Sequence, residues 1–193
     1  ERQLANICRK VATLIVSKKK KKLTVNPKAI NDLLGAERFI SDIAERSDKP
    51  GIVIGLAWTA FGGDILFIEA SKMPGKGMLK LTGKLGDVMK ESAQAAFSYI
   101  RANAKAMGID TNFYKKLDIH IHVPAGAIPK DGPSAGTAMV IAMTSLLLNK
   151  PVKQRLGVTG EISLRGNVLP IGGLKEKSTA AHRAGLTHIL VPS

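Results

Sequence analysis

The spacing of hydrophobic positions divides the chain into a helical start and a longer part in which strands and helices alternate. Over residues 1–17, apolar residues recur every three or four positions, which predicts one amphipathic helix. Asn26 and Pro27 then suit the cap and the first residue of a second helix that ends near Gly35. The polar stretch 36–50 predicts a linker, so we place a domain boundary at its end.

Beyond this boundary the pattern changes to short apolar segments, turns and amphipathic helices. Alternating apolar and polar positions predict strands, and apolar positions at helical spacing predict helices. The order of these elements predicts an α/β (α+β) fold of mixed strands and helices, preceded by a short helical segment. The predicted strands are 51–58, 65–70, 79–82, 117–123, 154–164, 168–170 and 187–191; the predicted helices are 86–107, 137–148 and 175–184; and 71–77 is predicted as a loop.

Composition and charge narrow the classes of function. The 193 residues carry a net charge of +14, and five of the positive charges form one run, Lys18 to Lys22. We expect nonspecific DNA contact through this basic surface, because no zinc spacing or aromatic pattern indicates sequence recognition. The single cysteine, Cys8, excludes an internal disulfide and favours a reducing compartment. No apolar run has the length of a membrane span, so we expect no membrane partner.

The stretch from Pro129 to Gly136 predicts a tight loop that opens into an apolar helix. Pro133 suits the first turn of a helix, where its missing N–H has no helical partner. Ser134 therefore lies at a helix N-terminus, where unpaired N–H groups and the positive end of the dipole favour a developing oxyanion. An ordinary serine N-cap is the other interpretation.

The same serine also fits the Gly-x-Ser-x-Gly pattern of a nucleophile elbow. That arrangement needs an acid and then a histidine after the serine, and two glutamates and two histidines do follow it. The elbow, however, follows a strand directly, whereas ten residues lie between Val123 and Ser134. We therefore place this interpretation behind one in which a lysine is the base.

Lys177 is the lysine best placed to serve as that base. It shares one face of the last predicted helix with apolar residues, whereas Lys175 points elsewhere. Burial lowers the pKa of a lysine, and a neutral amine can act as a general base. A lysine whose stem packs on the core while its amine reaches water is the alternative. The apolar residues on the same face are Leu174, Ala181 and Ala184.

Taken together, several segments resemble the proteolytic domain of Lon, the ATP-dependent serine protease. The resemblance covers residues 51–193, while residues 1–35 resemble the last helices of the ATPase module in the same family. It implies a helical end of the ATPase module plus linker at 1–50, and a Lon-type serine protease domain, cut short at its C-terminus, at 51–193. The motifs are Pro129-Lys-Asp-Gly-Pro-Ser-Ala-Gly136, Thr159-Gly-Glu-Ile162, Leu169-Pro-Ile-Gly-Gly-Leu-Lys-Glu-Lys177 and Gly55-Leu-Ala-Trp-Thr59.

The resemblance implies a Ser–Lys dyad in which Ser134 attacks the peptide carbonyl and Lys177 takes the serine proton. Thr159 matches a threonine that hydrogen-bonds the lysine, although a strand residue of high β propensity is the plainer interpretation. Asp131 matches an acidic residue associated with switching the loop between active and inactive forms, and a turn role fits it equally well. Backbone N–H groups around the serine, in the loop that holds Pro133 and Ala135, would bind the oxyanion.

Three further residues match positions that support the site in this family: His120, His122 and Glu69. The two histidines also have the i, i+2 spacing of metal ligands, but no third ligand accompanies them, so we expect no metal. The family commonly has Val-Pro-Glu-Gly-Ala after these histidines, whereas this chain has Ala125 in place of the glutamate. That departure affects a regulatory or subunit contact and leaves the dyad intact.

The function implied is a serine endopeptidase domain of an ATP-dependent Lon-type protease that degrades unfolded or damaged proteins through an acyl-enzyme. The chain has no Gly-x-x-x-x-Gly-Lys-[Ser/Thr], so we expect no cofactor in this part; ATP and magnesium would serve the ATPase module. We expect a homo-oligomer, a hexameric ring in the full enzyme, in a bacterial cytoplasm, with the mitochondrial matrix as the alternative. The rival is a non-catalytic Lon-like scaffold for assembly or DNA binding, against which the pair of Ser134 and Lys177 argues.

Overall fold

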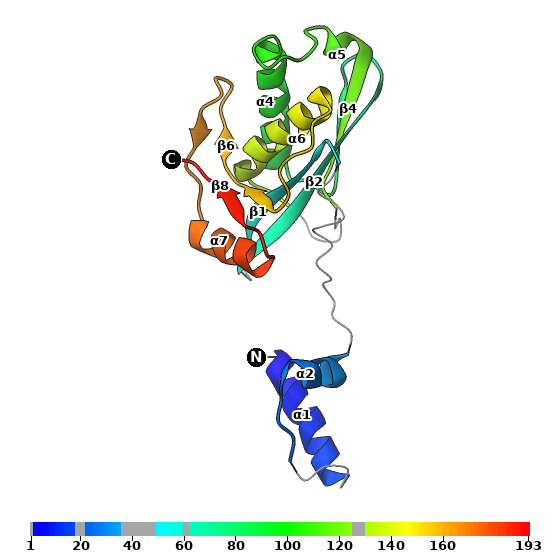
Figure 1. The fold of residues 1–193 in the computed structure, drawn as a ribbon, viewed down its shortest axis with the longest axis vertical. Coiled ribbons are helices and arrows are strands. Elements are labelled where there is room, and N and C mark those ends of the chain that lie inside the picture. Colours follow the sequence, from blue (N-terminus) through cyan, green and yellow to red (C-terminus); the bar gives the residue numbers. More distant parts are fainter. Residues whose placement is uncertain (1, 18–21, 36–48, 60–61, 125–129) are drawn as a thin grey trace. The chain divides into compact units, whose positions relative to one another are not determined.

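The chain divides into two compact units, residues 1–41 and 42–193, which are described separately below (Figure 1). The predicted boundary at residue 50 follows a stretch, 36–48, that lies outside the described residues, so the domain assignment stays a prediction. The computed structural model describes residues 2–17, 22–35, 49–59, 62–124 and 130–193.

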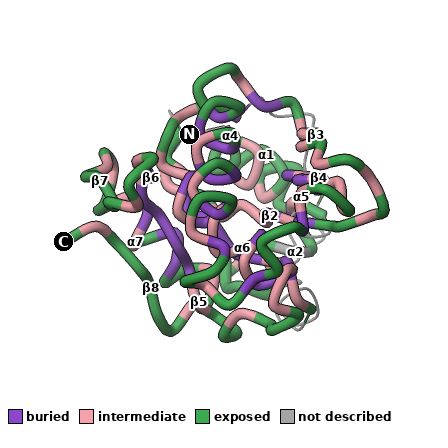
Figure 2. Tube along the Cα trace, turned by 90° about the horizontal axis from the view of Figure 1, so that it is seen from above, coloured by how far each residue is buried: buried purple, intermediate pink, exposed green. Residues whose placement is uncertain are grey.

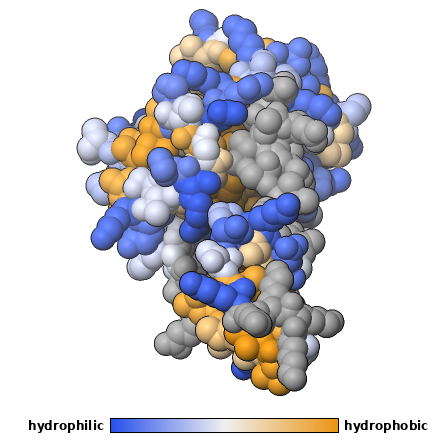
Figure 3. Space-filling view, turned by 60° about the horizontal axis from the view of Figure 1, so that its bottom comes forward, coloured by the Kyte–Doolittle hydropathy of each residue, from blue (hydrophilic) through white to orange (hydrophobic). Residues whose placement is uncertain are grey.

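As far as its residues are described, the first unit contains two helices in contact, α1 (Arg2–Val16) and α2 (Pro27–Leu34). Both predicted helices are confirmed. The predicted cap of α2 is confirmed as well, because the backbone N–H of Ala29 donates to Asn26 Oδ1 at 2.9 Å. Hydrophobic surface gathers on this unit (Figure 3). Its exposed large apolar residues are Leu4, Ile15, Val16, Val25 and Ile30.

The second unit is built on a six-stranded mixed sheet with the order β3-β4-β2-β1-β5-β8. The β2 strand pairs antiparallel with β1 and β4, and the remaining neighbours in the sheet are parallel. A separate antiparallel pair, β6 and β7, lies beside the sheet. The strands are β1 (Ile52–Thr59), β2 (Gly62–Pro74), β3 (Leu79–Thr82), β4 (Leu117–His122), β5 (Leu156–Val158), β6 (Glu161–Ile162), β7 (Val168–Leu169) and β8 (His188–Leu190).

Two long helices, α4 (Asp87–Asn103) and α6 (Gly136–Leu148), pack together, and the hydrophobic core lies between them and one face of the sheet. Alternate strand residues point to that face, so Ile119 and Ile121 are completely buried while their neighbours on β4 are not. Buried positions run along α4, α6 and the adjoining strands (Figure 2). The other helices among the described residues of this unit are α5 (Phe113–Lys116), the 3-10 helix η1 (Pro133–Ala135) and α7 (Leu174–Arg183), which packs against β1 and β2.

The predicted α/β class is confirmed, but two predicted elements are wrong in extent. The supposed loop at 71–77 begins as strand, because β2 continues to Pro74 and pairs there with Leu117 of β4. The supposed single strand 154–164 is two short strands, β5 and β6, that belong to different sheets. The helix α5 is present where the sequence analysis predicted no element.

The break between β5 and β6 brings the chain to the loop that carries Ser134, residues 130–136, which we call the serine loop. At the break, the N–H of Thr159 donates to Leu190 O at 3.0 Å, so this residue still follows the sheet. The next N–H, that of Gly160, turns away and donates to Ser134 O at 2.9 Å. Thr159 and Gly160 therefore connect the main sheet directly with the predicted nucleophile.

Candidate active site

The predicted serine lies in one turn of 3-10 helix that precedes α6. Gly132 has a φ of 122°, a conformation that residues with a Cβ rarely adopt, and it directs the chain into this turn. Pro133 then begins η1, and its carbonyl accepts the N–H of Gly136, the first residue of α6. Ser134 thus lies in a short turn directly before α6, which begins at Gly136, one residue earlier than predicted.

The structure brings Ser134, Lys177 and Thr159 into one hydrogen-bonded group. The amine of Lys177 lies 3.1 Å from Ser134 Oγ and 3.1 Å from Thr159 Oγ1. The threonine hydroxyl also donates weakly to Ser134 O, at 3.5 Å. Lys177 is 3% exposed, and this burial lowers the pKa of its amine. A buried amine with a lowered pKa beside a serine hydroxyl has the geometry and the basicity of a general base.

A close contact at the start of α7 fixes the position of this lysine. Gly173 precedes the helix with a φ of 70°, and a Cβ there would lie 2.8 Å from Trp58 Cγ. Gly63 on β2 lies similarly close to α7, because a Cβ there would meet Glu176 O at 1.9 Å. These contacts set the helix against the β1–β2 hairpin and direct Lys177 toward the serine.

The prediction of which α7 residues are buried is correct for Lys177 and wrong for Leu174. Lys177 and Ala181 are buried and Lys175 is exposed, in agreement with the helical spacing. Leu174 is 45% exposed, although it was expected on the buried face. It is the first residue of α7, and the buried side of the helix is formed by Lys177, Ala180 and Ala181.

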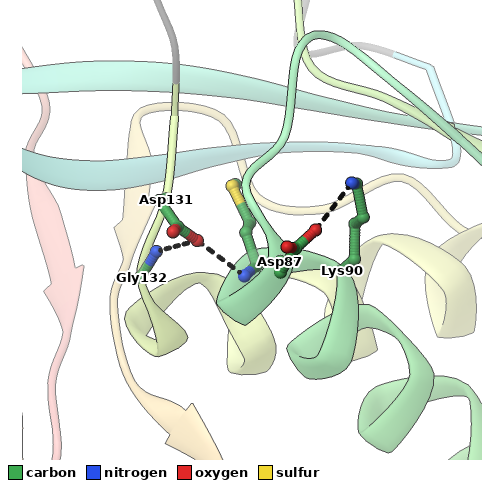
Figure 4. A network of polar contacts seen from close by, with 5 residues as sticks. Asp87, Lys90, Asp131 and Gly132 are labelled. Carbon is green, nitrogen blue, oxygen red and sulfur yellow. Dashed lines mark hydrogen bonds and ion pairs between the residues drawn. The ribbon is translucent and has the colours of Figure 1, made fainter.

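The carboxylate of Asp131 faces the N-terminus of α4, as Figure 4 shows. Its Oδ1 accepts the N–H of Met89 at 3.0 Å and the N–H of Gly132 at 2.9 Å. The start of a helix favours a negative charge, because its first N–H groups have no helical acceptor. Gly86 leaves room for the group, since a Cβ there would lie 2.3 Å from Asp131 Cγ. The nearby ion pair of Asp87 and Lys90 is exposed and adds little.

Sequence analysis missed Lys130, which ties the base of the serine loop to the sheet. Its amine donates to Gly83 O at 3.1 Å and to Val123 O at 3.4 Å. Its side chain is 7% exposed, and burial lowers the pKa of the amine. The only sequence signal was its place in the Pro129–Gly136 motif. Gly83 is remote in the chain, and no local pattern indicates that the amine reaches back to Val123 O.

The structure does not bring His120, His122 and Glu69 to the serine. The two histidine rings lie 2.9 Å and 2.7 Å from Thr82 Oγ1, and Glu69 is paired in register with His122. All three lie on the sheet face opposite the core, and none lines the cleft at Ser134. In the described ranges, no group of three or more side chains of the metal-binding types comes together.

An open cleft of about 780 Å³ borders the group of Ser134 and Lys177. Its wall is mainly apolar, which suits an extended polypeptide with hydrophobic side chains. Asp131, Pro133 and Ala135 also line it, whereas the Ala125 position lies outside the described residues. The main apolar residues are Leu56, Trp58, Ile65, Phe67, Pro170 and Ile171.

Residues 24–193 match the sequence model of the Lon protease (S16) C-terminal proteolytic domain. The chain belongs to this family, as the hydrogen-bonded group of Ser134, Lys177 and Thr159 had indicated. It is similar to three bacterial proteins named Lon protease or Lon protease 1. The protein of Brevibacillus choshinensis is 60% identical over 191 residues, which are 99% of this chain and 24% of the relative. That of Bacillus thuringiensis (strain Al Hakam) is 60% identical over 193 residues, 100% of this chain and 24% of the relative. That of Bacillus subtilis (strain 168) is 58% identical over 192 residues, 100% of this chain and 25% of the relative.

The chain therefore spans about a quarter of the length of these relatives. Their similarity extends over its whole length, the helical unit included. Within the part of the chain that the structure describes, no helix is long and apolar enough to cross a membrane.

Proposed function

We propose that this chain is the serine endopeptidase part of an ATP-dependent Lon-type protease, with Ser134 as nucleophile and Lys177 as general base. One observation supports this proposal most strongly: a buried amine with a lowered pKa lies 3.1 Å from a serine hydroxyl. Membership of the Lon proteolytic family gives independent support.

The hydrogen bonds suit a neutral lysine. In that state the Ser134 hydroxyl donates its proton to the Nζ lone pair, and an N–H of the amine donates to Thr159 Oγ1. The threonine hydroxyl donates in turn toward Ser134 O. Each buried polar group then has a partner without a net charge in the group.

Acyl transfer follows from this starting arrangement. Ser134 Oγ bonds to the substrate carbonyl carbon while its proton passes to Lys177 Nζ, and the carbonyl π electrons move to oxygen. When the tetrahedral intermediate collapses, the C–N bond breaks and Lys177 gives its proton to the leaving amine. Water then attacks the acyl-enzyme, Lys177 takes its proton, and the proton returns to Ser134 Oγ as the acid product leaves.

The oxyanion needs donors close to Ser134. Pro133 has no N–H, so the nearest backbone donors are the N–H groups of Ser134 and Ala135, at the start of η1 and α6. Both residues line the cleft.

In the whole protein, we infer that the substrates are unfolded or damaged polypeptides, for which an apolar open cleft is suited. The enzyme would be a homo-oligomer, hexameric in our proposal, in the bacterial cytoplasm. ATP and magnesium would serve the ATPase module, and this part would need no cofactor. The net charge of +14 supports nonspecific DNA contact, which a steep fall of binding with added salt would test.

The test is peptide hydrolysis by the full-length protein and by three variants. Ser134→Ala and Lys177→Met should each abolish turnover, and Ser134→Ala should also abolish labelling by a serine-reactive fluorophosphonate. Lys175→Met, which changes an exposed lysine on the same helix, should retain activity. If Ser134→Ala hydrolyses peptides at the wild-type rate, the proposal is wrong and the non-catalytic scaffold becomes the better interpretation.

A further inference from the structure

One face of α4 holds the serine loop at three successive points. The N–H of Gly86, which caps the helix, donates to Lys130 O at 2.7 Å, and the N–H of Met89 donates to the Asp131 carboxylate at 3.0 Å. Three residues further on, the hydroxyl of Ser92 donates to Pro133 O at 3.0 Å. The spacing of three keeps these positions on one side of the helix.

The third contact acts on the peptide that carries the nucleophile. In a trans peptide the carbonyl and the N–H point in opposite directions, so a fixed Pro133 O also fixes the direction of the Ser134 N–H. The following carbonyl, Ser134 O, is held from the other side by the N–H of Gly160 at 2.9 Å. The nucleophile therefore sits between two peptides that are each anchored by their oxygen.

The approach of Ser92 depends on a glycine. A Cβ on Gly136 would lie 2.7 Å from Ser92 Oγ, so a side chain there would push the hydroxyl away. Ser92 is 8% exposed. A serine inside a helix commonly bonds a carbonyl of its own preceding turn, whereas this hydroxyl reaches across to the loop.

We propose that Ser92 is a positioning residue of the peptidase site, an inference that rests on the function proposed above. Its hydroxyl orients the Pro133–Ser134 peptide so that the Ser134 N–H faces the oxyanion. The same bond keeps Ser134 Oγ within reach of Lys177. It touches neither substrate nor the reacting atoms, and it acts through the Pro133 carbonyl alone.

The test compares Ser92→Ala with Ser145→Ala in the full-length protein. Ser145 is the matched control, a buried serine on α6 whose hydroxyl donates to Lys150 O and accepts the N–H of Gly51, away from the serine loop. Ser92→Ala should lower kcat for a peptide substrate by about tenfold, the effect of one lost positioning bond, with KM unchanged. Its rate of labelling by a fluorophosphonate should fall by the same factor.

Ser145→Ala should lower the unfolding temperature by at least as much as Ser92→Ala and keep the wild-type kcat. If Ser92→Ala does not accumulate as folded protein, the test uses Ser92→Cys instead. The thiol fills the same space and is a weaker donor, so kcat should fall by less. The inference is overturned if the Ser92 variants keep wild-type kcat and labelling rate while Ser134→Ala is inactive. It is also overturned if Ser145→Ala loses kcat equally. A fully active Ser134→Ala overturns the proposed function itself.

Discussion

Replacement of Thr159 by valine removes one hydroxyl from the centre of the site at nearly constant volume. Thr159 is 1% exposed, and its Oγ1 is the acceptor 3.1 Å from Lys177 Nζ. Without it, an N–H of the buried amine loses its partner, which costs about 1–3 kcal/mol. If that cost falls on the transition state, kcat/KM drops roughly 5- to 150-fold, since 1.36 kcal/mol corresponds to a factor of ten.

The same variant should move the pH dependence of the reaction. Burial already lowers the pKa of Lys177. The Thr159 hydroxyl binds the ammonium form more strongly than the neutral amine, so its loss lowers that pKa further. Because the base acts in its neutral form, activity rises with pH through this pKa. The pH of half-maximal kcat/KM should therefore be lower in Thr159→Val than in the wild type.

The assay is steady-state peptide hydrolysis across a pH series, with thermal unfolding measured on the same samples. Thr144→Val is the control, because the buried hydroxyl of Thr144 has no hydrogen-bond partner among the described residues. That substitution removes an unpaired polar group and should preserve activity and slightly raise stability. A Thr159→Val protein with the wild-type rate and the wild-type pH midpoint would refute the role assigned to this threonine.

Three other perturbations test separate contacts. Between the lowered pKa of Lys177 and about 10.5, the folded wild type binds fewer protons than the unfolded chain, so its unfolding free energy should rise with pH. Lys177→Met should lose this rise, as denaturation curves measured across that pH range would show. The same pH dependence in both proteins would contradict the prediction. Gly86→Ala should displace the Asp131 carboxylate and reduce kcat/KM, and a double-mutant cycle with Asp131→Ala should give a coupling of about 0.5–3 kcal/mol rather than additivity. Gly173→Ala places a Cβ against Trp58 at positive φ and should lower stability by about 1–2 kcal/mol or more, measured by urea unfolding; an unchanged midpoint would argue against the contact.

Sequence patterns correctly predicted those elements whose structure depends on residues close together in the chain. The alternation that buries Ile119 and Ile121 and the cap that Asn26 supplies are both local, and both are confirmed. Patterns failed where the partner is remote in the chain. The strand β2 extends to Pro74 because β4 pairs with it, and the 154–164 segment breaks because Gly160 bonds the serine loop.

The candidate site shows the same division. Helical spacing correctly predicted the burial of Lys177, but its distance from Ser134 depends on how α7 docks, which no local pattern contains. The alternation along β4 placed His120 and His122 on one face, yet it could not reveal that neither histidine lines the cleft. No local pattern singled out the contact of Ser92, because a serine inside a predicted helix is common and its partner lies in another segment.

The contact between Trp58 and the start of α7 has an optical consequence. Trp58 is the single tryptophan of the 193 residues, it is 60% exposed, and it lines the cleft. Indole emission shifts to shorter wavelength when water is excluded from the ring. Within this chain, the fluorescence of one side chain therefore reports both the occupancy of the cleft and the seating of the helix that carries Lys177, without any added label.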